Sequence, residues 1–133
     1  MFTHILVPVD GSKTAELAVG KAIGMAQAFG SRVTVIYVID PYPFTGVGTD
    51  FAYGQAEYLS AATAEANTAV KAAKEAFADA TVKVETSVVE SHTAWRGIVA
   101  AGDSLQADLI VMGSHGRSGL EKLVLGSVAQ AVL

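Results

Sequence analysis

The sequence predicts an α/β fold, in which an open parallel sheet carries helices on both faces. Four short runs of aliphatic and β-branched residues alternate along the 133-residue chain with longer segments of helical periodicity. Two of these runs are apolar almost throughout, which is typical of strands covered on both faces of a parallel sheet. Hydrophobic residues make up 51% of the chain, enough for one core, and the length favours a single domain over residues 1–133.

The first half of the chain begins with a strand, a turn and a helix. The apolar run 5–9 is followed by Asp-Gly-Ser, whose serine, Ser12, is suited to cap a helix N-terminus. Apolar residues then recur at i, i+3 and i+4 spacing, which predicts one buried stripe on that helix. Gly30 provides a left-handed stop, and the apolar run 33–39 predicts a central strand.

The second half repeats the alternation. Residues 40–54 contain two of the three prolines and are expected to form an irregular connection, whereas the alanine-rich stretch 55–80 predicts a long helix. Valines alternate with polar residues over 82–88, which indicates a half-exposed strand at the sheet edge. A helix over 93–105 and a second central strand over 109–112 complete the expected order.

Composition and charge exclude several classes of protein. The chain has no cysteine, so disulfide frameworks, zinc ribbons and thiol catalysis are excluded. Nine basic residues against 13 acidic ones give a net charge of −4, which argues against general nucleic-acid binding. The apolar runs are too short for membrane insertion, and the N-terminus lacks the features of a signal peptide. We therefore expect a cytoplasmic protein.

Ligands of open parallel sheets bind beyond the carboxyl ends of the strands, where the strand order reverses. The candidate site therefore comprises the segments that follow the predicted central strands, at residues 10–12, 38–40 and 113–127. The last segment contains Gly113 and Gly116 and, after nine further residues, Gly126 and Ser127 at the start of an expected final helix. Such glycines let backbone N–H groups approach a phosphate, and the helix dipole favours an anion.

The glycine segment has a structural alternative, since a surface loop also uses glycine simply to turn. Its spacing fits neither the P-loop of nucleotide hydrolases nor the fingerprint of dinucleotide oxidoreductases, so neither class is expected.

The pattern Gly113-x-x-Gly116-x9-Gly126-Ser127 resembles the nucleotide-binding signature of the universal stress protein family. The opening Ile-Leu-Val-Pro-Val-Asp-Gly-Ser and the runs 35–40 and 108–113 resemble the strands of that family in the same order. The resemblance is to the family's adenine-nucleotide-binding branch, in which the glycine motif is intact. It implies a Rossmann-type, adenine-nucleotide α-hydrolase-like fold. In the family a fifth edge strand, through which many members dimerise, follows the last helix; it is absent from this sequence, so a homodimer is expected of a longer, full-length protein.

The resemblance also implies which residues bind the ligand, an ATP, ADP or AMP molecule with Mg or Mn on its phosphates. Asp10 would face the adenosine, beside Pro8 and Val9, and the backbone of Val38 would meet the adenine edge. The base and ribose would lie along Met112 and Gly113. The phosphates would be held by Gly116, Gly126, Ser127 and Val128, with Ser114, His115 and Arg117 close by. No protein metal ligand and no catalytic residue is assigned.

Purely structural roles remain open as alternatives for some of these residues. Asp10 is also a residue that forms turns with its own backbone, and a lone histidine such as His115 is more often a loop residue than a catalyst. The leading hypothesis is a nucleotide-dependent regulator of the stress response. A slow ATPase or autophosphorylating enzyme is a second, although no base with an orienting partner is evident. A nucleotide-free interaction module, using the helices and Trp95, is the third.

Overall fold

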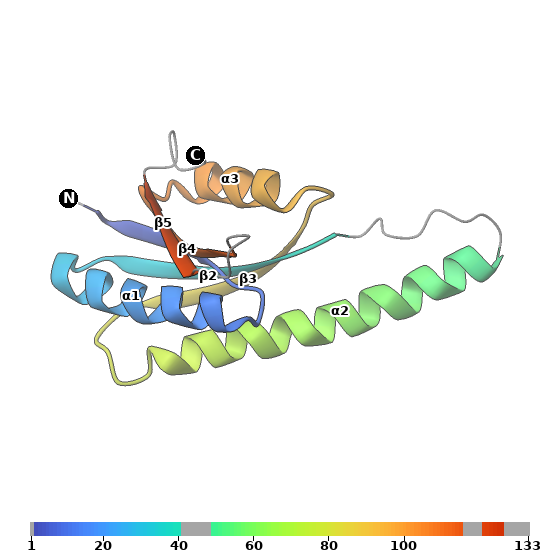
Figure 1. Cartoon of the computed structure of the whole chain (residues 1–133), viewed down its shortest axis with the longest axis horizontal. Helices are drawn as coiled ribbons and strands as arrows, with labels where there is room; N and C mark the ends of the chain where they lie inside the picture. The colour runs from blue at the N-terminus through green and yellow to red at the C-terminus, as the bar shows by residue number, and fades with distance from the viewer. Residues whose placement is uncertain (1, 41–48, 116–120, 127–133) are drawn as a thin grey trace.

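The computed structural model describes residues 2–40, 49–115 and 121–126, and it confirms the expected open α/β sheet. The strands have the order β3-β2-β1-β4-β5. Four are mutually parallel and lie within a few residues of the expected runs: β1 (His4–Pro8), β2 (Arg32–Ile39), β3 (Val84–Glu90) and β4 (Leu109–His115). The strand β4 continues through residues 113–115, which were expected to belong to the glycine-rich segment after it. Helices α1 (Lys13–Phe29) and α2 (Thr49–Ala76) cover one face of the sheet, and α3 (Ala94–Leu105) covers the other (Figure 1).

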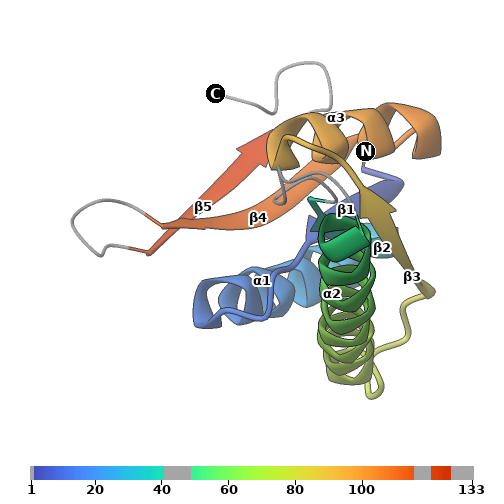
Figure 2. The ribbon, with the colours of Figure 1, turned by 90° about the vertical axis from the view of Figure 1, so that its right-hand side faces the viewer.

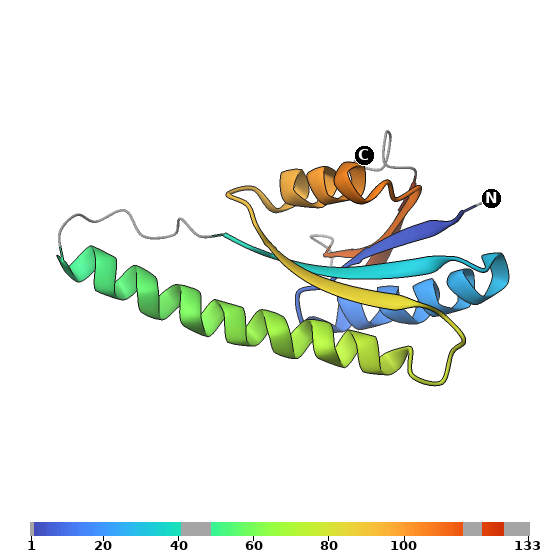
Figure 3. The same ribbon diagram turned by 180° about the vertical axis from the view of Figure 1, so that it is seen from behind.

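The core is divided between the two faces because side chains alternate along each strand. Ile5 and Val7 of β1 are fully buried toward α1 and α2, whereas Leu6 between them is buried toward α3. The edge strand β3 is only half-buried, as its alternating pattern predicts, and Figure 3 shows it lying beside β2 with α2 along the same face.

Both ends of α1 are formed by the residues that the sequence marks. The Ser12 hydroxyl accepts a hydrogen bond from the Ala15 amide at 3.1 Å, and Gly30 adopts a left-handed conformation with φ of 66°. Phe29, the last residue of the helix, packs edge-on against Phe2 with ring centroids 5.3 Å apart. The N-cap directs the first turn of α1 toward the carboxyl end of β1, where the candidate site lies.

The helix α2 is longer at its start than predicted. It begins at Thr49, so residues 49–54, expected to belong to an irregular connection, are helical. The prolines of that connection lie before Thr49, and nothing after it except Gly54 disfavours a helix. Within the described part of the chain no helix has both the length and the apolar character needed to cross a membrane.

A second difference concerns the segment after β4. A fifth strand, β5 (Glu121–Gly126), runs antiparallel to β4 where a loop was expected (Figure 2). Its apolar centre, Leu123 to Leu125, is compatible with a short strand, and the pairing satisfies backbone groups along the outer edge of β4. The helix expected to start at Gly126-Ser127 lies outside the described residues.

Candidate functional site

The carboxyl ends of β1 and β4 meet where the strand order reverses. From β1 the chain proceeds through β2 to β3 on one side and then crosses to β4 on the other. The crossover helices α1 and α2 lie on one face and α3 on the opposite face, so the ends of β1 and β4 form the switch point at which open α/β sheets bind their ligands. This arrangement places the predicted binding segments of β1 and β4 at one edge.

The turn after β1 is held by its own side chains. The Oδ1 atom of Asp10 accepts a hydrogen bond from the Ser12 amide at 2.9 Å, and Gly11 has φ of +82°. The structural alternative for Asp10 is thus present. Its carboxylate is nevertheless exposed, and Oδ2 has no hydrogen-bond partner among the described residues. The same side chain can therefore shape the turn and accept a hydrogen bond from a ligand.

Pro8 and Val9 form the end of the strand that leads to this turn. Pro8 is the last residue of β1, opposite Ile36, so its missing N–H falls at the strand end. Val9 is buried, and its amide donates to the Ile36 carbonyl at 2.8 Å, which extends the contact with β2 by one residue.

Gly113 is explained by packing. A Cβ atom at this position would overlap the Thr14 side chain and would lie 2.6 Å from the Thr14 carbonyl oxygen. Since that oxygen belongs to the first turn of α1, the backbone leaves no room for any side chain at 113. Glycine was expected here for contact with the ligand, whereas the structure shows that the close approach of β4 to α1 requires it.

The side chains of Val38 and Met112 lie on the opposite face from Val9. Both are half-buried against the cluster that packs beneath α3, where their neighbours include Leu6 and Ile98. Beside Val38, the Tyr58 hydroxyl donates to the Asp40 carbonyl at 3.1 Å, which ties α2 to the end of β2. The strand ends are thus brought together, while their side chains are divided between two faces of the sheet.

The phosphate-binding residues of the motif are placed only in part. Ser114 and His115 pair through their backbones with Lys122 and Glu121. Gly126 lies opposite Ile110, three residues back along β4 from Gly113, so the structure does not bring these two glycines together. Gly116, Arg117, Ser127 and Val128 lie outside the described residues, and their roles stay predictions.

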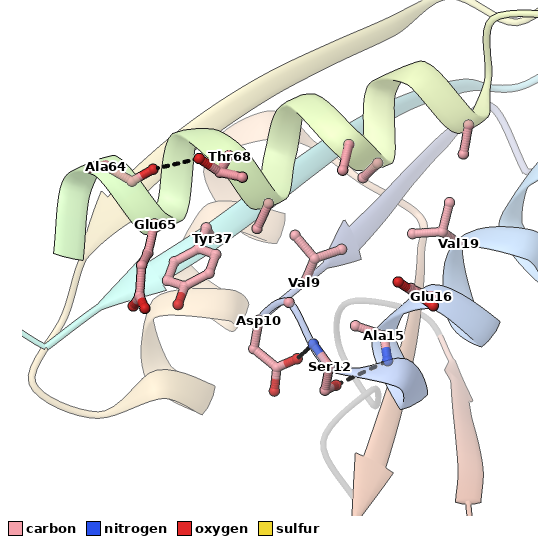
Figure 4. Close-up of a pocket in the computed structure, with 15 residues that line it drawn as sticks. Val9, Asp10, Ser12, Ala15, Glu16, Val19, Tyr37, Ala64, Glu65 and Thr68 are labelled. Carbon is pink, nitrogen blue, oxygen red and sulfur yellow. Dashed lines mark hydrogen bonds between the residues drawn. The ribbon is translucent and has the colours of Figure 1, made fainter. Parts of the chain in front are cut away.

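A cavity of about 800 Å³ opens beside the turn after β1, between α1 and α2. We call it the α1–α2 cavity (Figure 4). It is lined by Val9, Asp10, Gly11, Ser12, Ala15, Glu16, Val19, Tyr37, Ala64, Glu65, Thr68, Ala69, Ala72, Ala73 and Ala76. Tyr37 and Glu65 are not among the site residues predicted from the sequence. The signal that could have found this wall is the recurrence of alanine at helical spacing along one side of α2.

The raised pKa of Tyr37 indicates the sign of the electrostatic potential in this cavity. Burial raises the pKa of its phenol, and the negative charges of Glu65 and Asp10 raise it further. Figure 4 shows Glu65 and Tyr37 on the α2 side, near Asp10, at one end of the cavity. The potential at that end is therefore negative.

Comparisons with known proteins agree with the fold. A model of the Universal stress protein family matches residues 1–133. A universal stress protein of Methanocaldococcus jannaschii is 37% identical over 134 residues, covering 100% of this chain and 76% of the relative. The structure of UspA from Lactobacillus plantarum has a TM-score of 0.75 at 26% identity, covering 98% of this chain and 90% of that one.

A further solved structure is that of a universal stress protein in complex with cAMP. It is 25% identical with a TM-score of 0.50, and the match covers 82% of this chain and 70% of that one. Since the family model spans the whole sequence, and a relative above 30% identity matches all of it, this chain belongs to the universal stress protein family.

Proposed function

We propose that this protein binds an adenine nucleotide at the carboxyl ends of β1, β2 and β4 and acts as a nucleotide-dependent regulator in the stress response. The observation that carries the proposal is the position of the Asp10–Ser12 turn at the strand-order reversal, with an exposed carboxylate oxygen facing outward. Membership of the family and the cAMP complex of a related protein support the same ligand class.

In the proposed complex the ribose hydroxyls donate to Asp10, and the adenine edge meets the backbone of Val38. Met112 and Gly113 border the base and ribose from β4. The phosphates contact the backbone of the glycine motif at Gly116, with Ser114, His115 and Arg117 nearby. Contacts with Gly126, Ser127 and Val128 belong to the same proposal and require that Gly126 leave its place opposite Ile110 when the nucleotide binds. The phosphates lie toward β4, because Asp10, Glu16 and Glu65 make the α1–α2 cavity unfavourable for anions.

A divalent cation such as Mg or Mn belongs to this proposal as a companion of the phosphates. Among the residues that the structure describes, no three histidine or acidic side chains cluster closely enough to bind a metal ion. The phosphate oxygens of the nucleotide and water would therefore provide most of the ligands of this cation.

Regulation would follow from a difference in nucleotide affinity between two arrangements of the segment 40–54 or of a partner surface. Action as a cytoplasmic homodimer is part of the same proposal, and size-exclusion chromatography tests the oligomeric state. Phosphate release measured in the same samples distinguishes a binding protein from a slow ATPase or an autophosphorylating enzyme.

Isothermal titration calorimetry with ATP, ADP, AMP and cAMP, with and without Mg, tests the binding proposal. We expect saturable binding below millimolar concentration, weakened about tenfold in Asp10→Asn because one charge-assisted hydrogen bond is lost. Asp79→Asn, an exposed carboxylate in the turn after α2, is the matched control and should leave binding unchanged. The absence of saturable binding at millimolar nucleotide would contradict the proposal.

A further inference from the structure

The α1–α2 cavity has the size and the lining of a small-molecule site. Its volume of about 800 Å³ falls within the range of ligand pockets, roughly 300 to 1,000 Å³. Its α2 wall consists mainly of alanines, whose methyl groups do not fill the space between the helices. Val19 of α1 and Val9 at the end of β1 project toward α2 from the other side (Figure 4). An apolar ligand of moderate size would fit between these walls.

Among the described residues that line the cavity, Asp10, Glu16 and Glu65 carry ionisable carboxyl groups, and none is a lysine or an arginine. All three side chains are exposed, so the charges lie near the mouth while the interior is apolar. Between described residues the single ion pair joins His92 to Asp40, so none of the three is neutralised by a described cation. An anionic ligand would therefore be repelled at this mouth.

Tyr37 adds a surface that suits a positive group. Its half-buried ring lies at the same end of the cavity as Glu65 and Asp10 (Figure 4). An aromatic face attracts an ammonium group, and does so more strongly where carboxylates supply the surrounding field.

We propose that the α1–α2 cavity binds a small organic cation, whose ammonium group lies between Asp10 and Glu65 beside the Tyr37 ring, and whose apolar part rests on the alanine wall of α2. This site does not depend on the proposed nucleotide function, although the two would share Asp10. A cation bound here would also reduce the negative charge beside the candidate nucleotide site.

Three probes of the same shape and different charge test the proposal by calorimetry without nucleotide: 3-phenylpropylammonium, 3-phenylpropanol and 3-phenylpropionate. We expect the ammonium to bind about tenfold more tightly than the alcohol, since each partly exposed charge contact contributes a few-fold. The propionate should show no binding at the same concentration. Equal affinities for the three probes, or no binding of the ammonium, would overturn the proposal.

Two pairs of variants locate the site. Glu65→Gln should weaken ammonium binding about threefold and leave the alcohol unaffected, whereas Glu57→Gln, an exposed residue of α2 outside the cavity, should change neither. An equal effect of the two variants would indicate general surface attraction and refute the site.

The second pair tests shape. Ala69→Leu fills part of the cavity and should weaken both the ammonium and the alcohol at least about tenfold, because the apolar part loses its space. Ala56→Leu, on an exposed position of α2 that does not line the cavity, is its control. Circular dichroism of each variant verifies the fold, and unaltered probe binding in Ala69→Leu would refute the assignment.

Discussion

The two ends of the sheet differ in how their polar groups are used. At the amino end, Asp108 accepts hydrogen bonds from the Thr3 amide at 2.9 Å, the Thr3 hydroxyl at 3.1 Å and the His4 amide at 3.1 Å. The buried His4 ring contacts the Leu105 carbonyl at 3.0 Å and the Thr34 hydroxyl at 2.7 Å. At the carboxyl end, Asp10 accepts one such bond, from Ser12, and is otherwise exposed beside a cavity.

This difference assigns the polar groups of the amino end mainly to stability and Asp10 at the carboxyl end mainly to binding. The polar groups of the amino end bond to one another and join β1, β2, the end of α3 and the start of β4. At the carboxyl end, Asp10 leaves one carboxylate oxygen beside the α1–α2 cavity, where a ligand can reach it. We therefore expect polar substitutions at the amino end to act on the free energy of unfolding, and those at the carboxyl end to act mainly on binding.

The largest expected effect is an exception to this division. Gly113 lies at the carboxyl end, but its substitution should lower the free energy of unfolding because the packing of β4 against α1 requires glycine. Gly113→Ala would place a Cβ against the Thr14 backbone, and β4 would have to move from α1. We expect a loss of about 3 kcal/mol in the free energy of unfolding, the upper end for overpacking, measured by urea denaturation.

Gly24→Ala is the matched control on α1, since a Cβ there meets nothing within 4 Å. That substitution should stabilise the protein by about 0.5–1 kcal/mol, because alanine is the better helix former. If the two alanine variants changed stability in the same direction, the close approach of β4 to α1 would be wrong.

A second prediction compares the same residue type at the two ends. Asp108→Ala removes the acceptor of the Thr3 and His4 amides and should cost about 2 kcal/mol of unfolding free energy. Asp10→Ala removes a single bond at an exposed turn and should cost no more than about 1 kcal/mol. Urea denaturation of both variants provides the comparison, and equal losses would show that the two ends are not different in this respect.

Local patterns in the sequence predict most of the fold. The aliphatic runs predict the four parallel strands, and Ser12 and Gly30 mark both ends of α1, because caps and periodicity act over a few residues. The strand β5 was missed because Leu123 to Leu125 is short and is flanked by a loop-like sequence rich in glycine. Its pairing depends on β4 being adjacent, which is a tertiary fact.

The candidate site could be predicted less completely for the same reason. The Asp10–Ser12 turn follows from its own residues, and the structure places it as expected. The alanine wall, Glu65 and Tyr37 become a cavity only when α2 packs beside α1. Likewise the bond between Thr3 and Asp108 joins residues 105 positions apart, so no local pattern reveals it.

The smallest expected effect concerns His4 and pH. Burial, followed by the charge of Arg32, lowers the pKa of His4 despite the Leu105 carbonyl and nearby carboxylates, which raise it. The unfolded chain therefore binds a proton more readily than the native protein, and the free energy of unfolding should fall as pH decreases below about 6.5. The Leu105 carbonyl can only accept, so the Nδ1–H donates to it, and in the neutral ring Nε2 then accepts from the Thr34 hydroxyl.

Urea denaturation at pH 7.5 and 5.5 measures this dependence. His4→Gln should lower stability at both pH values and reduce the difference between them, because the titrating group is gone. His92→Gln, an exposed histidine at the opposite end of the sheet, should retain most of the wild-type difference. A pH dependence that followed His92 instead of His4 would mean that the carboxyl end also contributes to stability through its titrating groups, and the division between the two ends would have to be redrawn.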